Sequence, residues 1–209
     1  MKIYSFVGNG FSSNCYVILD GSCEHAVVID PSVGFDTVVS KLPARPSFDY
    51  ILLTHGHFDH ILELDDWRAR TGAPVFIHAE DADMLTDPKR SCFYQFYGLQ
   101  TAFAPADGSF DDGMLLQFGD ACLKVLHTPG HSGGSVCFLA EDLLVTGDTL
   151  FADGGVGRTD LPGGNMVALR ASLRSILAMP RNLKIYPGHG DPSTIGTELN
   201  NHSYLITEV

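Results

Sequence analysis

The sequence predicts a mixed α+β fold that forms a single domain over residues 1–209. Short apolar runs with strand character alternate with helical patterns in the first half, and strand-like runs dominate the second half. A chain of 209 residues with 44% hydrophobic and 18% charged residues suits one substantial globular domain. In both halves, apolar runs lead into loops that carry histidine, and we expect the chemistry of the protein in these loops.

The first half has a βαβ-like rhythm. Apolar side chains at helical spacing predict a helix that Pro43 closes, and a second helix with Ile61, Leu64 and Trp67 on one face. The expected strands are residues 2–7, 14–20, 26–29, 51–53 and 74–77, and the expected helices are residues 34–42, 61–70 and 79–86.

The regular pattern stops between residues 87 and 112, where aromatic residues gather behind Lys89 and Arg90. A loop of this length within a globular domain is often a lid or a binding loop. The aromatic side chains could instead fill a small satellite core. The sequence leaves both interpretations open.

The second half is rich in strands, with one long helix. The strands are expected at residues 114–116, 122–126, 135–139, 143–145 and 182–186. Residues 147–164 form a glycine-rich loop, and an apolar stripe then predicts a helix over residues 165–178 with Asn165 as its N-cap.

Charge and cysteine usage restrict the partners and the location. The net charge of −12 argues against non-specific nucleic-acid binding, which relies on a basic surface. The sequence contains no apolar run of transmembrane length, so we expect no membrane partner. The five cysteines include no CxxC pair and lie mostly in apolar runs, so we expect small buried side chains and a cytoplasmic protein. The oligomeric state is not encoded.

One segment concentrates potential metal ligands. Directly after the apolar run 50–53, the chain reads Thr54-His55-Gly56-His57-Phe58-Asp59-His60. Imidazole and carboxylate groups together suit divalent zinc, iron or manganese. A strand that runs into this segment would deliver these side chains to one edge of a sheet, and the sequence therefore predicts a metal site there.

Further along the chain, three positions resemble the first loop in their placement. His131, Asp148 and His189 each follow a predicted strand, and each is directly preceded by glycine. Glycine permits backbone conformations and close approaches that larger residues cannot make. These three side chains are candidates to complete the metal site.

This set of motifs resembles the metallo-β-lactamase superfamily over essentially the whole chain. It is most similar to the hydroxyacylglutathione hydrolases (glyoxalase II) and their short single-domain relatives, through the segments 54–60, 128–132 and 157–164. The resemblance implies an αββα four-layer sandwich, in which two mixed sheets pack face to face with helices outside. It also implies that the C-terminal glutathione-binding helical domain is missing, because residues 190–209 are too few for it.

The resemblance further implies a dinuclear site with two divalent ions, zinc or alternatively iron or manganese. The first ion would bind His55, His57 and His131. The second would bind Asp59, His60 and His189, with Asp148 shared by both. In this family a metal-bound hydroxide attacks the substrate, so Asp59 and Asp148 are the expected catalytic residues.

Other residues are candidates for substrate binding or support. The substrate would be a small-molecule thioester, and glutathione-derived if Arg158, Lys89, Arg90 and Tyr94 contact it; Arg158 could instead form an ion pair with Asp160. Histidine ligands need oriented partners, and Asp30 and His127 are candidates for that role. Asp30 could instead cap its own turn, and His127 could be purely structural. His25 and His202 are expected at the surface.

Competing functions share parts of the motif set. A mononuclear iron persulfide dioxygenase would use His55, His131 and Asp148 alone. Zinc β-lactamases of the common type carry cysteine at the position of Asp148, which argues against that activity. A non-catalytic metal-binding module is the remaining alternative. The sequence departs from the dioxygenases after Gly157-Arg158-Thr159-Asp160, and this departure and the overall spacing favour the thioester hydrolase. The full ligand set argues against the non-catalytic module.

Overall fold

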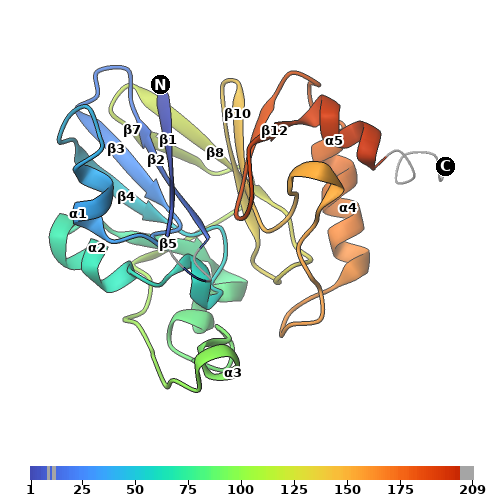
Figure 1. The fold of residues 1–209 in the computed structure, drawn as a ribbon, viewed down its shortest axis with the longest axis horizontal. Helices are drawn as coiled ribbons and strands as arrows, with labels where there is room; N and C mark the ends of the chain where they lie inside the picture. The colour runs from blue at the N-terminus through green and yellow to red at the C-terminus, as the bar shows by residue number, and fades with distance from the viewer. Residues whose placement is uncertain (9, 11–12, 203–209) are drawn as a thin grey trace. The chain divides into compact units, whose positions relative to one another are not determined.

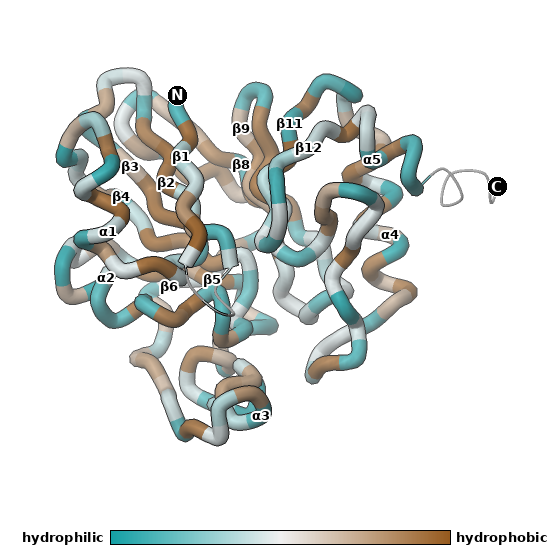
Figure 2. The backbone as a smooth tube through the Cα atoms, in the orientation of Figure 1, coloured by the Kyte–Doolittle hydropathy of each residue, from teal (hydrophilic) through white to brown (hydrophobic). Residues whose placement is uncertain are grey.

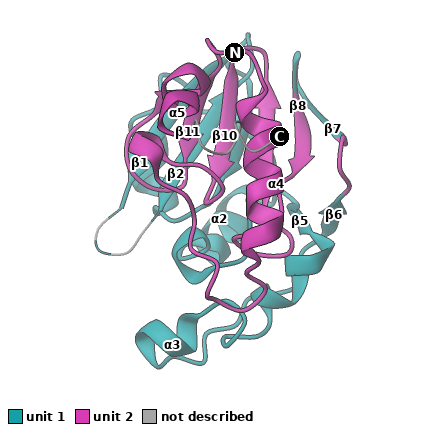
Figure 3. Cartoon of the chain, turned by 90° about the vertical axis from the view of Figure 1, so that its right-hand side faces the viewer, with its two compact units in different colours: residues 1–110, 115–122 teal, residues 111–114, 123–209 magenta. Residues whose placement is uncertain are grey.

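The computed structural model describes residues 1–8, 10 and 13–202, and it contains two six-stranded sheets with helices (Figure 1). The contacts between residues divide the chain into two units (Figure 3). The first unit comprises residues 1–110 and 115–122, and the second comprises residues 111–114 and 123–209. The prediction of one domain over residues 1–209 stays a prediction.

The first sheet is mixed and has the order β1-β2-β3-β4-β5-β6. The pairs β1–β2 and β2–β3 are antiparallel, whereas β3, β4, β5 and β6 run parallel. The carboxyl ends of β3 and β4 therefore lie at the same edge of the sheet. The strands are Lys2–Val7 (β1), Asn14–Leu19 (β2), His25–Ile29 (β3), Ser47–Leu52 (β4), Val75–His78 (β5) and Gly108–Phe110 (β6).

The helices α1 and α2 of the first unit pack together at Trp67, a fully buried residue of α2. Its ring makes edge contacts with Phe35 and Phe48 at 5.1 Å between centroids, and its Nε1 donates to Val33 O at 2.8 Å. The α-helices are Phe35–Val39 (α1), Leu64–Thr71 (α2) and Phe93–Tyr97 (α3), and the 3-10 turns are Phe58–His60 (η1) and Ala79–Leu85 (η2). The second helix starts later than residue 61 because η1 and the turn after it occupy the preceding residues.

The segment 87–112 is not a structureless loop, because it contains α3 and β6. Phe93 and Phe103 are buried, whereas Tyr94 is 48% exposed. The residues that flank α3, Cys92 and Gly98, both have a positive φ, which fixes how the chain enters and leaves this short helix. The aromatic residues thus form partly a core and partly a surface.

The second sheet is also mixed and has the order β12-β11-β10-β9-β8-β7. Strands β10 and β11 are parallel, and β9 is antiparallel to both β8 and β10. The strands β8, β10 and β11 therefore point the same way, and their carboxyl ends lie at one edge. The strands are Leu115–Phe118 (β7), Ala121–His127 (β8), Val136–Ala140 (β9), Leu143–Gly147 (β10), Lys184–Pro187 (β11) and Ser193–Thr194 (β12).

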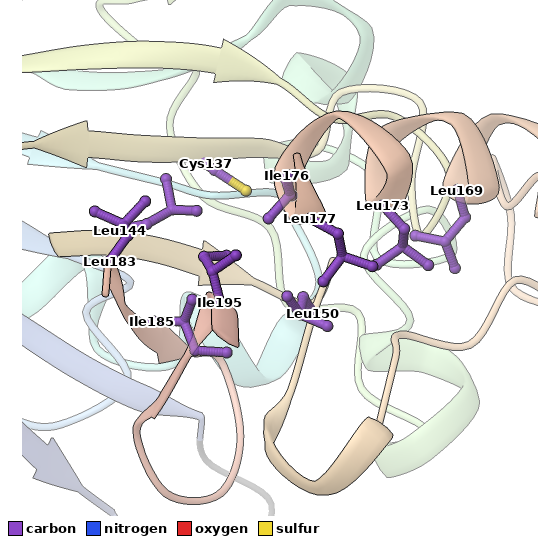
Figure 4. Packing of buried hydrophobic residues seen from close by; sticks show 10 residues of the cluster. All are labelled: Cys137, Leu144, Leu150, Leu169, Leu173, Ile176, Leu177, Leu183, Ile185 and Ile195. Atoms are coloured by element: carbon purple, nitrogen blue, oxygen red, sulfur yellow. The ribbon is translucent and has the colours of Figure 1, made fainter. Parts of the chain in front are cut away.

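The core of the second unit lies between its strands and α4, Met166–Leu177. The predicted cap is confirmed, because Asn165 Oδ1 accepts from the N–H groups of Val167 and Ala168. Figure 4 shows the apolar side chains of α4 beside those of the strands. Each buried leucine or isoleucine contributes about 1.5–3 kcal/mol. The cluster consists of Cys137, Leu144, Leu150, Leu169, Leu173, Ile176, Leu177, Leu183, Ile185 and Ile195.

Hydrophobic residues follow the strands, as the brown segments along β2 and β3 show in Figure 2. Three of the cysteines, Cys15, Cys92 and Cys137, are buried as the sequence predicted. Burial raises the pKa of the Cys15 thiol to about 12 and that of Cys137 to about 11, so both stay protonated at neutral pH. In the described part of the chain, no helix has the length and apolar character needed to cross a membrane.

Two elements near the C-terminus were not expected: β12 and the helix Ile195–Asn201 (α5). The helix places Glu198 in a fully buried position, where its carboxylate accepts from Gly154 N at 2.8 Å, Ser193 Oγ at 2.5 Å and Asn201 Nδ2 at 3.0 Å. Gly154 belongs to the turn Ala152–Gly154 (η3). The prediction of a surface position for His202 is wrong, because this residue is 1% exposed beside α5.

We expect Glu198→Ala to lower the free energy of unfolding by about 3 kcal/mol, because buried donors lose their acceptor. Glu198→Gln is the matched control. Its carbonyl oxygen can replace Oε2, and the Ser193 hydroxyl can rotate to accept from the new amide, so we expect a cost of about 1 kcal/mol. Denaturant unfolding at neutral pH measures both; equal losses in the two variants would contradict the role of the acceptors.

Candidate metal centre

The loop after β4 holds three buried imidazoles in the first unit, those of His55, His57 and His60. The ring centroids of His55 and His57 are 4.7 Å apart, and those of His55 and His60 are 4.1 Å apart. A ring nitrogen of His55 lies within 4.8 Å of one from each of the other two histidines. Neutral imidazole is a common metal ligand, so buried imidazoles this close together suit a shared metal ion.

The η1 turn sets the next two candidate ligands side by side. His60 N donates to His57 O at 3.1 Å and closes the turn, which brings His60 Nε2 to 3.8 Å from Asp59 Oδ2. This separation exceeds that of a hydrogen bond. It suits two donors that face the same ion.

Asp30 fixes the orientation of His60. Its Oδ2 lies 2.8 Å from His60 Nδ1 and 2.7 Å from Thr54 Oγ1, and its Oδ1 accepts from Thr54 N at 2.8 Å. Because a carboxylate only accepts, His60 carries its proton on Nδ1 and presents a lone pair on Nε2. Asp30 itself has a positive φ of 52°.

Gly56 lies between the first two histidines at a point where no side chain fits. A Cβ at this position would lie 2.5 Å from the Cβ of Met84, on the η2 turn. The glycine thus lets residues 54–60, which we call the metal loop, pass directly over η2. This close approach explains why glycine separates the first two histidines of the motif.

The second unit brings three further candidates together at the carboxyl edge of its sheet. Gly147 of β10 is the register partner of Pro187 of β11, so the chain delivers Asp148 and His189 next to each other. Asp148 Oδ2 lies 3.5 Å from His131 Nε2 and 3.6 Å from His189 Nε2. Both separations are too long for good hydrogen bonds. Two donors bound to one zinc at ~2.1 Å would stand roughly 3.4 Å apart, which matches.

The segment that begins at Gly157 orients His131 from behind. Arg158 O lies 2.8 Å from His131 Nδ1, and a carbonyl only accepts, so the proton of this histidine is on Nδ1 and Nε2 faces Asp148. A Cβ at Gly157 would lie 1.9 Å from Asp148 O and 2.9 Å from His131 Nδ1. Sequence reasoning considered only the side chain of Arg158 and missed this backbone role.

The side chain of Arg158 forms the ion pair that the sequence left open. Its Nε and Nη2 each lie 2.6 Å from a carboxylate oxygen of Asp160. The bidentate contact with Arg158 lowers the pKa of Asp160 to about 2. Both side chains are exposed, so a substrate carboxylate would compete with Asp160 for the guanidinium.

His127 supports the loop that carries His131. Its Nε2 donates to Gly133 O at 2.9 Å, and its backbone N–H donates to Asp112 at 2.9 Å. The neighbouring Thr128 hydroxyl lies 3.1 Å from that of Thr149, which connects this loop to the turn after Asp148. The contacts of His127 within its unit are thus those of a structural group.

The other candidates for substrate binding lie in the first unit, around α3. Arg90 Nη2 lies 3.3 Å from Asp83 Oδ1, whereas Lys89 is exposed. Tyr94 N donates to Pro88 O at 2.9 Å, and its ring is exposed. The structure therefore gathers His55, His57, Asp59, His60 and Asp30 in one unit. It gathers His131, Asp148, His189, Arg158 and His127 in the other.

A comparison with protein-family models adds a decisive observation. The model described as "Metallo-beta-lactamase superfamily" matches residues 8–189. The chain belongs to the metallo-β-lactamase superfamily. Its two mixed six-stranded sheets with helices match the fold of that superfamily, which confirms the predicted fold class.

The curated relatives with functional names include metallo-hydrolases and a hydroxyacylglutathione hydrolase. A "Probable metallo-hydrolase YqgX" from Bacillus subtilis is 38% identical over 158 residues, which cover 74% of each chain. The "Hydroxyacylglutathione hydrolase GloC" from Haemophilus influenzae is 31% identical over 213 residues, which cover 98% of each chain. The chain is thus similar to metallo-hydrolases along almost its whole length.

Three solved structures are similar in fold and in sequence. The BLEG-1 B3 metallo-β-lactamase has a TM-score of 0.90 and 33% identity, covering 98% of this chain and 99% of that chain. TTHA1623 in a di-iron-bound form has a TM-score of 0.80 and 31% identity, covering 95% and 98%. ETHE1 from Myxococcus xanthus has a TM-score of 0.78 and 27% identity, covering 100% and 86%. At least one of these similar structures therefore contains iron rather than zinc.

Proposed function

We propose that this protein is a dinuclear metal-dependent hydrolase that cleaves thioesters, of the hydroxyacylglutathione hydrolase type. The observation that carries the proposal is the position of Asp148 Oδ2 at 3.5 and 3.6 Å from the Nε2 atoms of His131 and His189. A carboxylate between two imidazoles suits a ligand shared by two ions. The similarity to GloC supports the thioester as the substrate class.

The proposed ligand set follows the family motif. His55, His57 and His131 would hold the first ion. Asp59, His60 and His189 would hold the second, and Asp148 would be shared. The donors fit divalent metals, because His60 and His131 both direct an unprotonated Nε2 away from their hydrogen-bonded Nδ1. Zinc is our first choice, with iron or manganese as alternatives, and a di-iron relative supports iron.

When bound, the two ions would supply a hydroxide nucleophile at neutral pH and stabilise the developing oxyanion. The residues of the chain would hold the two ions and orient the groups around them. Asp59 and Asp148 are acceptor groups that can align the attacking water and receive its proton through a hydrogen bond. Asp30 and the carbonyl of Arg158 keep His60 and His131 in one tautomer, so neither ring has to rotate or shift a proton during turnover.

A glutathione-derived thioester is the finer part of the proposal, and it requires cations for the substrate carboxylates. Arg158 is the best placed cation, because its guanidinium group already pairs with a carboxylate, that of Asp160. Lys89 is exposed and offers a second positive charge, while Arg90 contacts Asp83. Tyr94 is a candidate for contact with the rest of the substrate.

We expect Arg158→Ala to raise the KM for carboxylate-bearing thioesters about fivefold, with metal content unchanged, since the carbonyl that orients His131 remains. The pKa of Asp160 should also rise from about 2 toward 3.8, which carboxyl NMR measures. Asp160→Asn is the matched control. It releases the guanidinium and should lower the KM. An increase in KM in both variants would instead assign the pair a purely structural role.

One alternative remains, a mononuclear iron persulfide dioxygenase on His55, His131 and Asp148. The likeness to ETHE1 lends it some support without favouring it over the hydrolase. The likeness to the BLEG-1 B3 metallo-β-lactamase makes a β-lactam a substrate worth assaying as well.

The test uses the purified full chain with S-lactoylglutathione, a persulfide and a β-lactam as separate substrates. The proposal expects thioester hydrolysis that a chelator abolishes and zinc, iron or manganese restores. Persulfide-dependent oxygen uptake without thioester hydrolysis would overturn it. Cleavage of the β-lactam alone would support the assignment as a hydrolase and would replace the thioester by a β-lactam as the substrate class.

A single catalytic domain over residues 1–209 and a cytoplasmic location are part of the same proposal. The spacing of the cysteines supports the location, because it lacks the paired patterns of disulfide frameworks. A small-molecule substrate suits a hydrolase of this superfamily.

A further inference from the structure

An aromatic side chain lies inside the metal loop itself. Phe58 stands between His57 and Asp59, and its ring stacks on Phe96 of α3 with centroids 4.9 Å apart and planes at 28°. Tyr97 of the same helix contacts the Phe58 ring edge-on at 5.5 Å. These contacts attach α3 directly to the loop that carries the candidate ligands.

The backbone strengthens this attachment. Phe58 N donates to Ser91 O at 2.8 Å, and Ser91 N donates to Asp87 O at 3.0 Å, so the turn before α3 is also bonded to the metal loop. Beneath the helix, the rings of Phe93 and Phe103 pack at 5.7 Å and are buried. The helix therefore rests on a packed base, and its outward side is held in place.

The outward side is apolar and exposed. We define the aromatic surface as Tyr94, Phe96, Tyr97 and Leu99, whose exposed fractions are 48%, 44%, 43% and 51%. Figures 1 and 3 show α3 at the periphery of its unit. Clustered exposed apolar side chains are unfavourable in water and mark binding sites when they are contiguous.

The chemistry of the aromatic surface selects its ligand. None of its members is charged, and the tyrosine hydroxyls are its only side-chain polar groups. Arg90, the nearest arginine in the sequence, lies 3.3 Å from Asp83. An uncharged apolar group is the ligand that fits.

We propose that the aromatic surface binds the acyl group of the substrate, and that this acyl group is a long apolar chain. The inference rests on the proposed function and narrows its substrate class. Neighbouring Cα atoms are about 3.8 Å apart, so Phe58 keeps the surface within a short reach of the ligands on either side of it. A thioester carbonyl bound near His57 and Asp59 would thus extend its acyl chain over the buried ring of Phe58 and along the exposed ring of Phe96.

The test measures kcat/KM for acetyl, butyryl, hexanoyl and octanoyl thioesters of one small uncharged thiol. For a half-buried chain we expect an increase of about twofold per methylene group. The variant Tyr94→Ser/Leu99→Ser should lower the octanoyl-to-acetyl ratio about tenfold, with the metal content unchanged. Tyr94→Phe should retain the wild-type ratio, because the ring remains.

The matched control is Val7→Ser/Leu115→Ser, which removes two exposed apolar side chains elsewhere in the same unit. It should leave the ratio unchanged. A wild-type enzyme without chain-length dependence, or a Tyr94→Ser/Leu99→Ser variant with the wild-type ratio, would overturn the inference.

A binding measurement separates this inference from the proposed function. Ketone analogues with a methylene in place of sulfur cannot be hydrolysed, and calorimetry gives their affinities. If thioesters are not cleaved but the octyl ketone binds more tightly than the methyl ketone, and only the Tyr94→Ser/Leu99→Ser variant loses this preference, the acyl site stands and the function fails. Thioester cleavage without chain-length dependence would support the proposed function and would contradict the acyl-binding site.

Discussion

Asp148→Asn is expected to reduce kcat/KM for the thioester at least about a thousandfold and to remove at least one of two bound ions. The carboxylate lies 3.5 and 3.6 Å from His131 and His189, and it is the one proposed ligand that both ions share. An amide is neutral and binds cations more weakly. The loss of several kcal/mol of transition-state stabilisation corresponds to this reduction in rate.

Asparagine has nearly the shape of aspartate, so the fold should persist, which circular dichroism checks. The control is Asp142→Asn in the same unit, where an exposed carboxylate contacts Lys184. It should retain full metal and rate. A fully metallated Asp148→Asn protein with the wild-type rate would show that this carboxylate is not a ligand.

Asp30→Asn is expected to weaken the second metal site about 10- to 100-fold, although Asp30 is not itself a proposed ligand. The Oδ2 atom of Asp30 lies 2.8 Å from His60 Nδ1 and 2.7 Å from Thr54 Oγ1. An amide nitrogen at that position would donate to His60 Nδ1 and move the ring proton to Nε2, where it blocks the metal. Asparagine tolerates the positive φ of 52° as aspartate does, so backbone strain does not change.

Competitive chelator titration measures the affinity of each site in this variant. Asp36→Asn, an exposed aspartate of the same unit, is the control. Equal affinities in Asp30→Asn and the wild type would mean that His60 keeps its tautomer without Asp30. A loss of both ions together with unfolding would assign Asp30 to the fold rather than to the site.

The metal loop and its scaffold could be predicted from the sequence because their signals are local. Apolar runs mark β3, β4 and β10, and they are followed by Asp30, by the histidines of residues 55–60 and by Asp148, respectively. Asn165 and the apolar stripe behind it predicted α4 to within a residue at each end. Side-chain chemistry and periodicity both depend on residues that are close in the sequence, so such elements can be predicted from the sequence alone.

Other parts of the fold and site depend on contacts between distant residues. The helix α5 is short and polar, and its place depends on Glu198, whose carboxylate accepts from Gly154 44 positions away. The role of Arg158 at His131 belongs to a backbone carbonyl, which leaves no trace in residue identity. The five-residue α3 is too short for a periodic pattern. These features required the structure.

The most direct test of the central claim is the number of metal ions per chain, measured by elemental analysis on the purified, catalytically active protein. We predict two ions per chain, and thioester hydrolysis that rises in proportion as the second ion is restored to metal-free protein. A single iron per active chain, with oxygen uptake on persulfide and no thioester hydrolysis, would contradict the dinuclear hydrolase.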